Sequence, residues 1–223
     1  MSEGVVTTSL ERFGLSSSCP ALMAKRRDLS RRSSKSEGGS AVSNHGDNMT
    51  SLSYEAVIDR IGILDILAPF DPHVVGTLPL GIALPNSDID IVCQASDPDV
   101  VANLLWTAFS SADDFTLYRW SARGRPLIAK FKAESWPFEI FASTELVAEQ
   151  SGWQHFVVER QLLDLAGFAL RDQIMALRLQ GMKTEPAFAT ALGLPGDPYE
   201  AMRALYWLSE MELAEIISNS PEL

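Results

Sequence analysis

The stretch GTLPLGIALPNSDIDIVC, residues 76–93, constrains the fold of this chain more than any other. It opens with a glycine behind a short apolar run and ends in an alternating segment in which Asp88 and Asp90 lie among branched apolar residues. Side chains alternate between the two faces of a strand, so both aspartates are expected on one face, roughly 7 Å apart at their Cα atoms. The stretch therefore predicts a strand, residues 87–92, with one acidic face and one core face.

Two neighbouring carboxylates on one strand face repel each other by about 3 kcal/mol at an effective dielectric constant near 20. Such a pair is tolerated when it is solvated, protonated or bridged by a cation. We favour bridging, because hard oxygen ligands on a rigid strand suit Mg²⁺ or Mn²⁺, and two such ions can activate an attacking oxygen and hold a leaving phosphate. A solvated strand face is the alternative.

Gly76 and Thr77 form the other half of this pattern, twelve residues before Asp88. A glycine turn lets backbone N–H groups and a hydroxyl approach a triphosphate, because glycine has no Cβ to keep an anion at a distance. We expect Gly76, Thr77 and Ser87 to contact the triphosphate of a nucleotide.

This combination resembles the signature of the polymerase β-like nucleotidyltransferase superfamily: a Gly-Thr turn, about a dozen residues, then Asp-x-Asp in a strand. More narrowly, the stretch resembles the opening motif of a bacterial group in that superfamily, catalogued as a domain of unknown function. Residues 154–160, 183–189 and 196–199 look like the same group. The resemblance covers roughly residues 52–205 and implies the fold and a metal triad, but it names no substrate.

In the superfamily a third metal-binding acid comes from a later strand, and the resemblance assigns that role to Glu139. Phe138 and Ile140 flank it and take the opposite face of a predicted strand, residues 137–142. The alternative is an acid on the wet face of an edge strand. Lys130 and Lys132, on the preceding arm of the hairpin, contact phosphate or are solvated lysines.

Further candidate residues lie in the second half of the chain. His155 and Arg160 belong to a polar cluster that the resembled group shares, although a surface or capping role is the alternative. Residues 183–188 are expected to form a fixed loop between helices, with Lys183 near a phosphate and Glu185 near an acceptor hydroxyl or amine. A local ion pair that caps helix ends explains Lys183 and Glu185 equally well.

Charge is unevenly distributed along the 223 residues. Residues 1–48 hold seven Lys and Arg against five Asp and Glu, which leaves 11 basic and 24 acidic residues, a net charge of −13, for the rest. An acidic surface repels a phosphate backbone, so a long nucleic-acid substrate is disfavoured. No apolar run approaches 18 residues, so no membrane span is expected, and Cys19 and Cys93 fit a reducing, cytoplasmic compartment.

The pattern of elements predicts an α+β fold: a small mixed or antiparallel sheet flanked by helices, followed by a C-terminal helical region. We expect a Ser-rich, basic, disordered tail over residues 1–48, with a start assigned too far upstream as an alternative explanation of it. A nucleotidyltransferase-like core is expected over residues 49–145, and helices over residues 146–223. One helix is expected from its N-cap Ser53 until Pro69 ends it. Two further helices are expected over residues 153–165 and 169–179. A final helix from Asp197 through Ile216 begins with a capping box and has Met211 in its apolar stripe.

Three functions compete. The first is an enzyme in which Asp88, Asp90 and Glu139 bind two Mg²⁺ or Mn²⁺ ions and transfer a nucleoside monophosphate from a nucleoside triphosphate such as ATP to a small-molecule or protein acceptor. The second is a catalytically silent binding protein with the same fold, such as the antitoxin-like partner of a two-gene module. The third is a metal-dependent phosphohydrolase. A protein partner or a homodimer is compatible with each.

Overall fold

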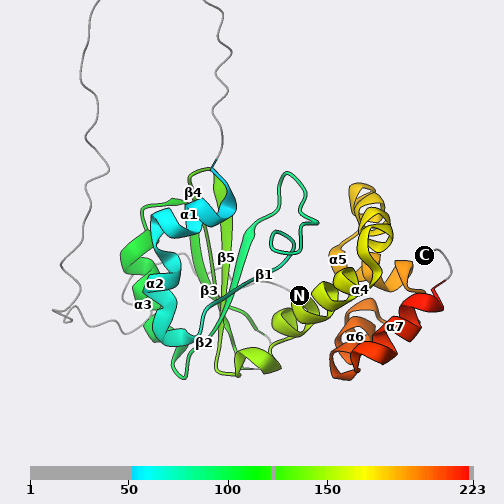
Figure 1. The fold of residues 1–223 in the computed structure, drawn as a ribbon. Helices are drawn as coiled ribbons and strands as arrows, with labels where there is room; N and C mark the ends of the chain where they lie inside the picture. Colours follow the sequence, from blue (N-terminus) through cyan, green and yellow to red (C-terminus); the bar gives the residue numbers. More distant parts are fainter. Residues whose placement is uncertain (1–51, 122–123, 221–223) are drawn as a thin grey trace, which may run out of the picture.

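The computed structural model describes residues 52–121 and 124–220. A five-stranded mixed sheet has helices α1 to α3 on one side, and the helices α4 to α7 gather beyond the other (Figure 1). This arrangement confirms the predicted α+β class with a C-terminal helical region. The strands are β1 His73–Val75, β2 Ile89–Gln94, β3 Asp113–Arg119, β4 Leu127–Ala133 and β5 Trp136–Ser143. The helices are α1 Tyr54–Ile61, α2 Ile63–Leu67, α3 Pro98–Phe109, α4 Ser151–Leu179, α5 Thr184–Ala191, α6 Pro198–Ala204 and α7 Glu210–Ser218, with single 3₁₀ turns at Ala68–Phe70, Val147–Glu149 and Leu205–Trp207.

The sheet order is β1-β2-β5-β4-β3, and only the pairing of β2 with β5 is parallel. The parallel register pairs Ile89 with Phe138 and Asp90 with Glu139. Ile89 and Phe138 are buried in the core under α1 to α3, so their sequence neighbours Asp90 and Glu139 take the other face.

The first helical segment differs from the sequence expectation of one continuous helix. Ser53 caps α1 as predicted, since its hydroxyl accepts a hydrogen bond from the Ala56 N–H. Gly62 then adopts a left-handed conformation with φ of 65° and ends α1, so that α2 begins separately. A glycine in this conformation satisfies the last carbonyls of a helix at little steric cost, which is why the apolar period alone did not reveal the break.

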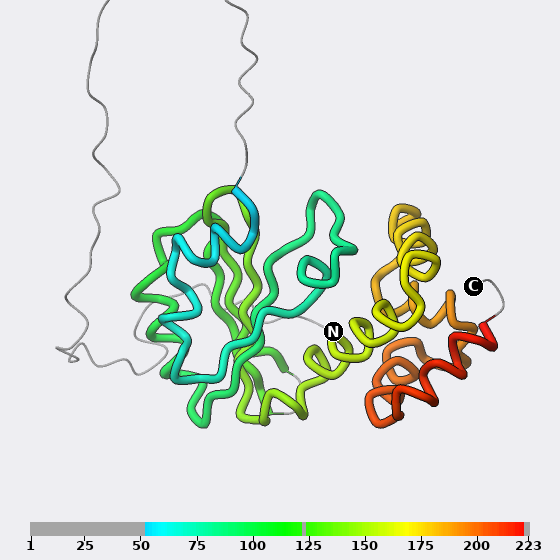
Figure 2. Tube along the Cα trace, viewed as in Figure 1, coloured from blue at the N-terminus to red at the C-terminus, as the bar shows by residue number. Residues whose placement is uncertain are grey.

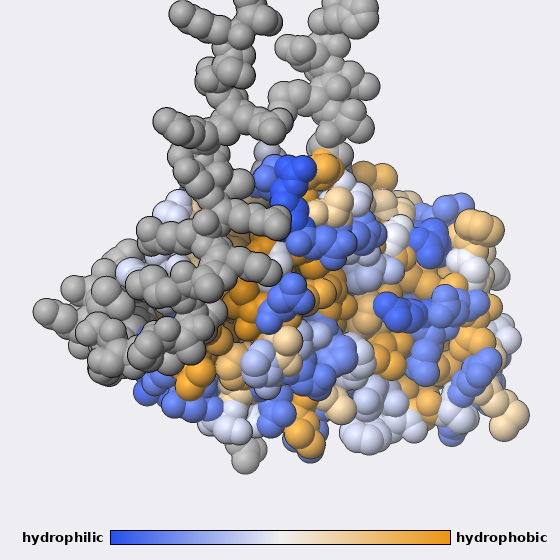
Figure 3. Space-filling model, turned by 60° about the vertical axis from the view of Figure 1, so that its left-hand side comes forward, coloured by the Kyte–Doolittle hydropathy of each residue, from blue (hydrophilic) through white to orange (hydrophobic). Residues whose placement is uncertain are grey.

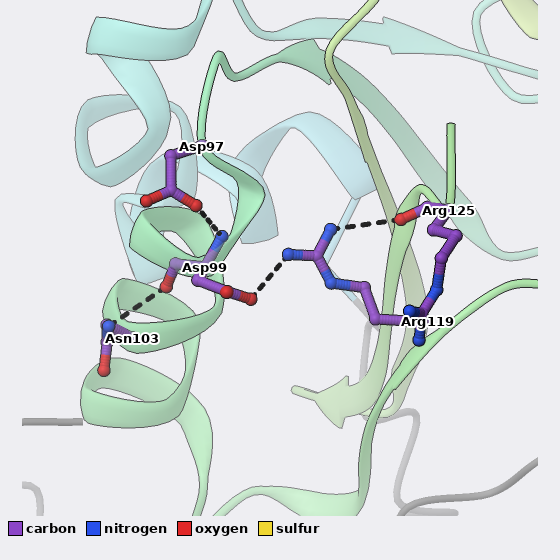
Figure 4. Close-up of polar contacts among 5 residues, drawn as sticks. All are labelled: Asp97, Asp99, Asn103, Arg119 and Arg125. Atoms are coloured by element: carbon purple, nitrogen blue, oxygen red, sulfur yellow. Dashed lines mark hydrogen bonds and ion pairs between the residues drawn. The ribbon is translucent and has the colours of Figure 1, made fainter. Parts of the chain in front are cut away.

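Polar contacts tie the start of α3 to the connection between β3 and β4 (Figure 4). Asp97 caps α3, and its Oδ1 accepts a hydrogen bond from the backbone N–H of Asp99. The Asp99 carboxylate accepts a hydrogen bond of 2.5 Å from Arg119, which also donates to the carbonyl of Arg125. Asn103 donates to the Asp99 carbonyl. This network follows the C-terminal end of β2, so it lies at the opposite end of the sheet from Asp90.

The helical region differs from the sequence expectation at three points. Residues 184–188 form the first turns of α5 rather than a loop, because Pro186 lies in the first turn, where a helix needs no N–H from it. The expected final helix is divided into α6 and α7, and the capping box belongs to Ser209 and Glu212 of α7, not to Asp197. Met211, expected in the buried stripe, is 80% exposed. The break expected between residues 165 and 169 is present as a kink inside α4 at Gly167, with φ of 65°.

A second core joins the helices to the acidic face of the sheet. Val75, Val92 and Phe141 of the strands pack with α4 to α7 in this cluster. Between β1 and β2 the chain leaves the sheet and extends between the sheet and the helices (Figure 2). On the face shown in Figure 3, hydrophobic and hydrophilic residues are interspersed.

Two further observations bear on the sequence expectations. In residues 52–121 and 124–220, no helix is long and apolar enough to cross a membrane. Cys93 is a free, buried thiol whose pKa burial raises to about 12, whereas Cys19 and the expected tail lie outside the described residues.

Candidate active site

The three predicted acids lie on or directly before the two parallel strands, β2 and β5. Asp90 is in β2, and Glu139 is its direct partner in β5. Asp88 immediately precedes β2, which begins at Ile89 rather than at Ser87 as the sequence suggested. Asp88 is near enough for its charge to raise the pKa of Asp90. The parallel pairing thus brings together carboxylates that are about fifty residues apart in sequence.

Asp90 carries the strongest electrostatic signal of these acids. Burial, followed by the charges of Asp88 and Glu139, raises the pKa of Asp90 to about 8, and the charge of Glu185 adds to the effect. Lys130 opposes it. Because burial and like charges both disfavour the ionised form, a bound cation at this position would relieve a large repulsion.

Gly76 makes room for the Asp90 carboxylate. Its φ is 76°, and a Cβ added at this position would lie 2.1 Å from Asp90 Oδ2. The glycine of the predicted turn is therefore needed for the close approach of β1 to the acid as well as for its left-handed backbone. Any larger residue at position 76 would move Asp90, so a substitution there would not isolate the approach of a phosphate.

The donor set of Asp88, Asp90 and Glu139 fits Mg²⁺ or Mn²⁺ in its chemistry, since these ions prefer carboxylate oxygens. Within the described part of the chain, however, no three His, Cys, Asp or Glu side chains converge closely enough to hold a metal ion as they stand. Lys130 Nζ instead lies 2.5 Å from Glu139 Oε2, on the neighbouring strand. The Lys130 ammonium thus engages one of the two carboxylate oxygens of Glu139 and offsets its charge.

Thr77 and Ser87, predicted to contact phosphate, meet each other at the base of the segment that joins β1 to β2. We refer to residues 76–87 as the nucleotide loop, after the phosphate contacts that the sequence predicted for them. Thr77 Oγ1 donates a hydrogen bond of 3.2 Å to Ser87 Oγ, which also accepts one of 2.9 Å from the Leu84 N–H. The Ile82 N–H donates to the Thr77 carbonyl at 3.1 Å. These bonds close the nucleotide loop beside Asp88.

His155 and Glu185 form a pair on the helical side. His155 Nδ1 lies 3.4 Å from Glu185 Oε1, and His155 Nε2 lies 3.0 Å from the Tyr199 carbonyl. A carbonyl and a carboxylate can only accept, so Nε2 donates to Tyr199, and Nδ1 must also carry a proton in order to donate to Glu185. Burial acts to raise the pKa of Glu185, but the hydrogen bond from His155 and further contacts bring it below its usual value. The charge of Glu185 adds to the rise in the pKa of Asp90, so the Glu185 carboxylate lies within electrostatic reach of that acid.

Arg160 and Lys183 are the remaining residues that the sequence predicted for the site. The exposed Arg160 side chain stacks its guanidinium over the buried Phe156 ring, 4.4 Å from the ring centroid. Lys183 is exposed and precedes α5, where its charge lowers the pKa of Glu185. Neither side chain lies against the three acids through a contact that the structure records.

Sequence reasoning missed two arginines, Arg171 and Arg178. Both lie in the second half of α4 and donate to backbone carbonyls of the nucleotide loop. The one signal in the sequence was the presence of arginines beside the apolar positions Leu170, Ile174 and Leu177 of a helix.

The model of the family described as domain of unknown function DUF4269 matches residues 56–205, which is most of the chain. The chain belongs to this family. The match spans the nucleotide loop, the three acids and the His155–Glu185 pair of this DUF4269 chain. A comparison with curated proteins gave no match.

Several solved structures are weakly similar to the DUF4269 chain. The Cid1 poly (U) polymerase bound to MgGTP has a TM-score of 0.44 and 17% identity, over 56% of this chain and 40% of the polymerase chain. A mutant of that polymerase bound to MgATP has a TM-score of 0.47 and 14% identity, over 67% and 47% of the two chains. The GLD-2/RNP-8 complex gives 0.46 and 11%, over 76% and 78%. The chain thus spans less than half of the Cid1 chains, and similarities at this level do not establish a function.

Proposed function

We propose that this chain is a metal-dependent nucleotidyltransferase that moves a nucleoside monophosphate from a nucleoside triphosphate to an acceptor and releases pyrophosphate. The observation that carries the proposal is the parallel register of β2 and β5, which sets Glu139 beside Asp90, near Asp88 and next to Gly76. Three carboxylates beside a glycine turn support a site for divalent ions and a triphosphate.

In this proposal Asp88, Asp90 and Glu139 hold two Mg²⁺ or Mn²⁺ ions, which when bound lower the pKa of the attacking hydroxyl and neutralise charge on the triphosphate. In this proposal the Ser87 hydroxyl would donate to a phosphate oxygen, and the Thr77 hydroxyl would do so in place of its hydrogen bond to Ser87. Lys130, once released from Glu139, and Lys183 supply positive charge. Positioning and charge neutralisation are sufficient, because phosphoryl transfer needs no dedicated protein nucleophile.

Glu185 is assigned to the acceptor. His155 keeps the Glu185 carboxylate ionised by lowering its pKa against the effect of burial, so it can accept a hydrogen bond or a proton from an acceptor hydroxyl or amine. Arg160 is assigned to the rim of the same side. A small molecule or a protein is the proposed acceptor, because a net charge of −13 over residues 49–223 disfavours a long nucleic acid.

A second candidate is the catalytically silent binding protein. The ion pair of Lys130 with Glu139 favours it, because an ammonium that neutralises the third acid would serve a fold that no longer binds metal. A phosphohydrolase would use the same acids with water as acceptor.

The deciding experiment measures melting temperature and product formation with EDTA, Mg²⁺ and Mn²⁺, each with and without nucleoside triphosphate. Metal plus nucleotide should stabilise the wild type by about 2.7 kcal/mol at a hundredfold excess over Kd. Asp88→Asn, Asp90→Asn and Glu139→Gln should abolish that increment and any transfer. Asp113→Asn, which removes an exposed carboxylate from the far edge strand, is the matched control and should leave both unchanged.

Each alternative gives a different result. Pyrophosphate and a nucleotidylated acceptor indicate the transferase, whereas hydrolysed nucleotide without an acceptor indicates the phosphohydrolase. A wild-type melting curve that is indifferent to millimolar Mn²⁺ plus nucleotide would refute the enzyme and leave the binding protein.

A further inference from the structure

Two arginines of α4 hold three consecutive carbonyls of the nucleotide loop. Arg171 Nη1 donates to the Leu80 carbonyl at 3.0 Å and to the Gly81 carbonyl at 2.8 Å. Arg178 Nη1 donates to the next carbonyl, that of Ile82. The two arginines are seven residues apart, two helical turns, and therefore lie on one face of the half of α4 that follows the Gly167 kink.

The nucleotide loop is shaped to admit this contact. Gly81 has φ of 67°, and a Cβ added there would lie 2.6 Å from Arg171 Nη1. Glycine is thus needed both for the left-handed backbone and for the approach of the guanidinium. Ile82, next in the chain, is fully buried in the helical core, which anchors the tip of the loop against α4.

Arg178 is buried, so its hydrogen bond to the Ile82 carbonyl replaces contacts with water. Its side chain is only 9% exposed, and within the described residues its Nε has no hydrogen-bond partner. Glu159, 4% exposed, likewise has an Oε1 without a partner there, and burial raises its pKa well above the usual value. Because the buried Nε has no partner, the hydrogen bond of Nη1 to the Ile82 carbonyl contributes to satisfying this guanidinium, beside the charges of Glu159 and Glu185.

Hydrogen bonds connect the peptide groups that the arginines hold to Thr77 and Ser87 at the base of the nucleotide loop. The peptide group between Gly81 and Ile82 is held at both ends, since Arg171 binds its carbonyl and the Thr77 carbonyl accepts from its N–H. Thr77 in turn donates to Ser87, the residue before Asp88. A shift of the Gly81–Ile82 peptide would therefore displace Thr77 and Ser87.

We propose that Arg171 and Arg178 are positioning residues that fix the nucleotide loop from α4, so that the affinity for nucleotide depends on the second half of this helix. This inference rests on the proposed function, because it names what sets the affinity of that same site. The arginines touch the loop backbone and do not touch the acids.

The test compares Arg171→Met, Arg171→Lys and the double variant Arg178→Met with Glu159→Gln, which avoids leaving one buried charge alone. Arg203→Met, on α6, removes the same charge from the helical region without a loop contact and is the control. Gly81→Ala disturbs the same contact from the loop, because its Cβ would meet Arg171 Nη1. Two quantities are measured: hydrogen exchange of the Gly81, Ile82 and Ser87 amides, which are bonded within the loop, and the affinity for Mn²⁺ plus nucleoside triphosphate.

The arginine variants and Gly81→Ala should exchange these amides faster and weaken nucleotide binding about tenfold, the effect of one charge-assisted hydrogen bond. Nucleotide KM should rise with kcat at saturation retained, Arg171→Lys should recover part of the loss, and Arg203→Met should match the wild type. Unchanged exchange, or faster exchange with unchanged affinity in a protein that binds nucleotide, overturns the proposal. If the wild type binds no nucleotide but the arginine variants exchange the loop amides faster, the result shows that the arginines fix the loop and refutes the proposed transferase instead.

Discussion

At the scale of single residues, Asp90 is held in surroundings that disfavour its charge. Its carboxylate is largely buried, lies among Asp88, Glu139 and Glu185, and has Lys130 as the opposing cation. The stability of the fold does not require an acid at position 90, because burying an apolar or amide side chain there would cost less free energy than burying a carboxylate. The unfavourable placement is understandable where a cation compensates it.

The raised pKa gives a pH dependence of stability in the metal-free protein. The folded-state pKa of about 8 lies above the ordinary value of 3.8 that applies in the unfolded chain, so ionisation of Asp90 destabilises the fold. The penalty is absent below about pH 4, grows as pH rises and is complete above about pH 8, and each tenfold difference in proton affinity between the folded and unfolded states corresponds to about 1.4 kcal/mol. Asp90→Asn should raise the melting temperature in EDTA at about pH 8 and flatten its dependence between about pH 4 and pH 8.

The matched control is Asp59→Asn, which removes an exposed carboxylate from α1. It should leave the pH dependence intact. An Asp90→Asn protein whose melting temperature follows the wild-type pH profile would contradict the electrostatic account of this acid.

At the scale of elements, the hairpin of β4 and β5 sets the position of Glu139. Ala133 pairs with Trp136, so Glu134 and Ser135 alone form the turn, with φ of 49° and 71°. Two-residue turns of this hand suit Asn and Gly, because other side chains are strained in the left-handed region. The hairpin was predicted from the sequence, although neither Asn nor Gly is present at positions 134 and 135.

Replacing Glu134-Ser135 by Asn-Gly should therefore stabilise the protein by about 1–2 kcal/mol in urea unfolding. The lost pair of Arg60 with Glu134 is exposed and offsets little of this gain. Ser135→Ala, which keeps a Cβ at the same φ, should give no gain. Equal stability of the Asn-Gly variant and the wild type would show that the turn is not strained.

At the scale of the whole molecule, two hydrophobic cores share one sheet. The first lies between the sheet and α1 to α3, and the second joins β1, β2 and β5 to the C-terminal helices. The predicted site uses groups from both: the acids come from the strands, and His155 and Glu185 come from the helices. Leu52 packs against the first core, and its carbonyl accepts a hydrogen bond from Trp136.

Deletion of residues 1–48 should therefore leave the melting temperature unchanged within about 2 °C, where 1 kcal/mol corresponds to about 2–4 °C for a chain of this size. Nucleotide binding should also persist. Deletion to residue 55 is the control, and it should destabilise the protein because it removes Leu52 and the Tyr54 ring that contacts Trp136. A loss of several degrees in the shorter deletion would show that residues 1–48 stabilise the fold.

The local pattern of the sequence was sufficient to predict the acidic strand face, the glycine turn and the β4–β5 hairpin, because alternation, turn residues and caps act between near neighbours. It was misleading at Gly62, where the helix ends, and in residues 183–188, where a helix starts instead of a loop. At both places the local sequence permits either conformation, and tertiary packing determines which one forms. Tertiary structure alone decided that β2 pairs with β5 in parallel, and that Arg171 and Arg178 reach carbonyls 91 and 96 residues away. Every residue has a backbone carbonyl, so the sequence around residues 80–82 contains no sign of which arginines bind there, and only the packing of α4 against the sheet determines it.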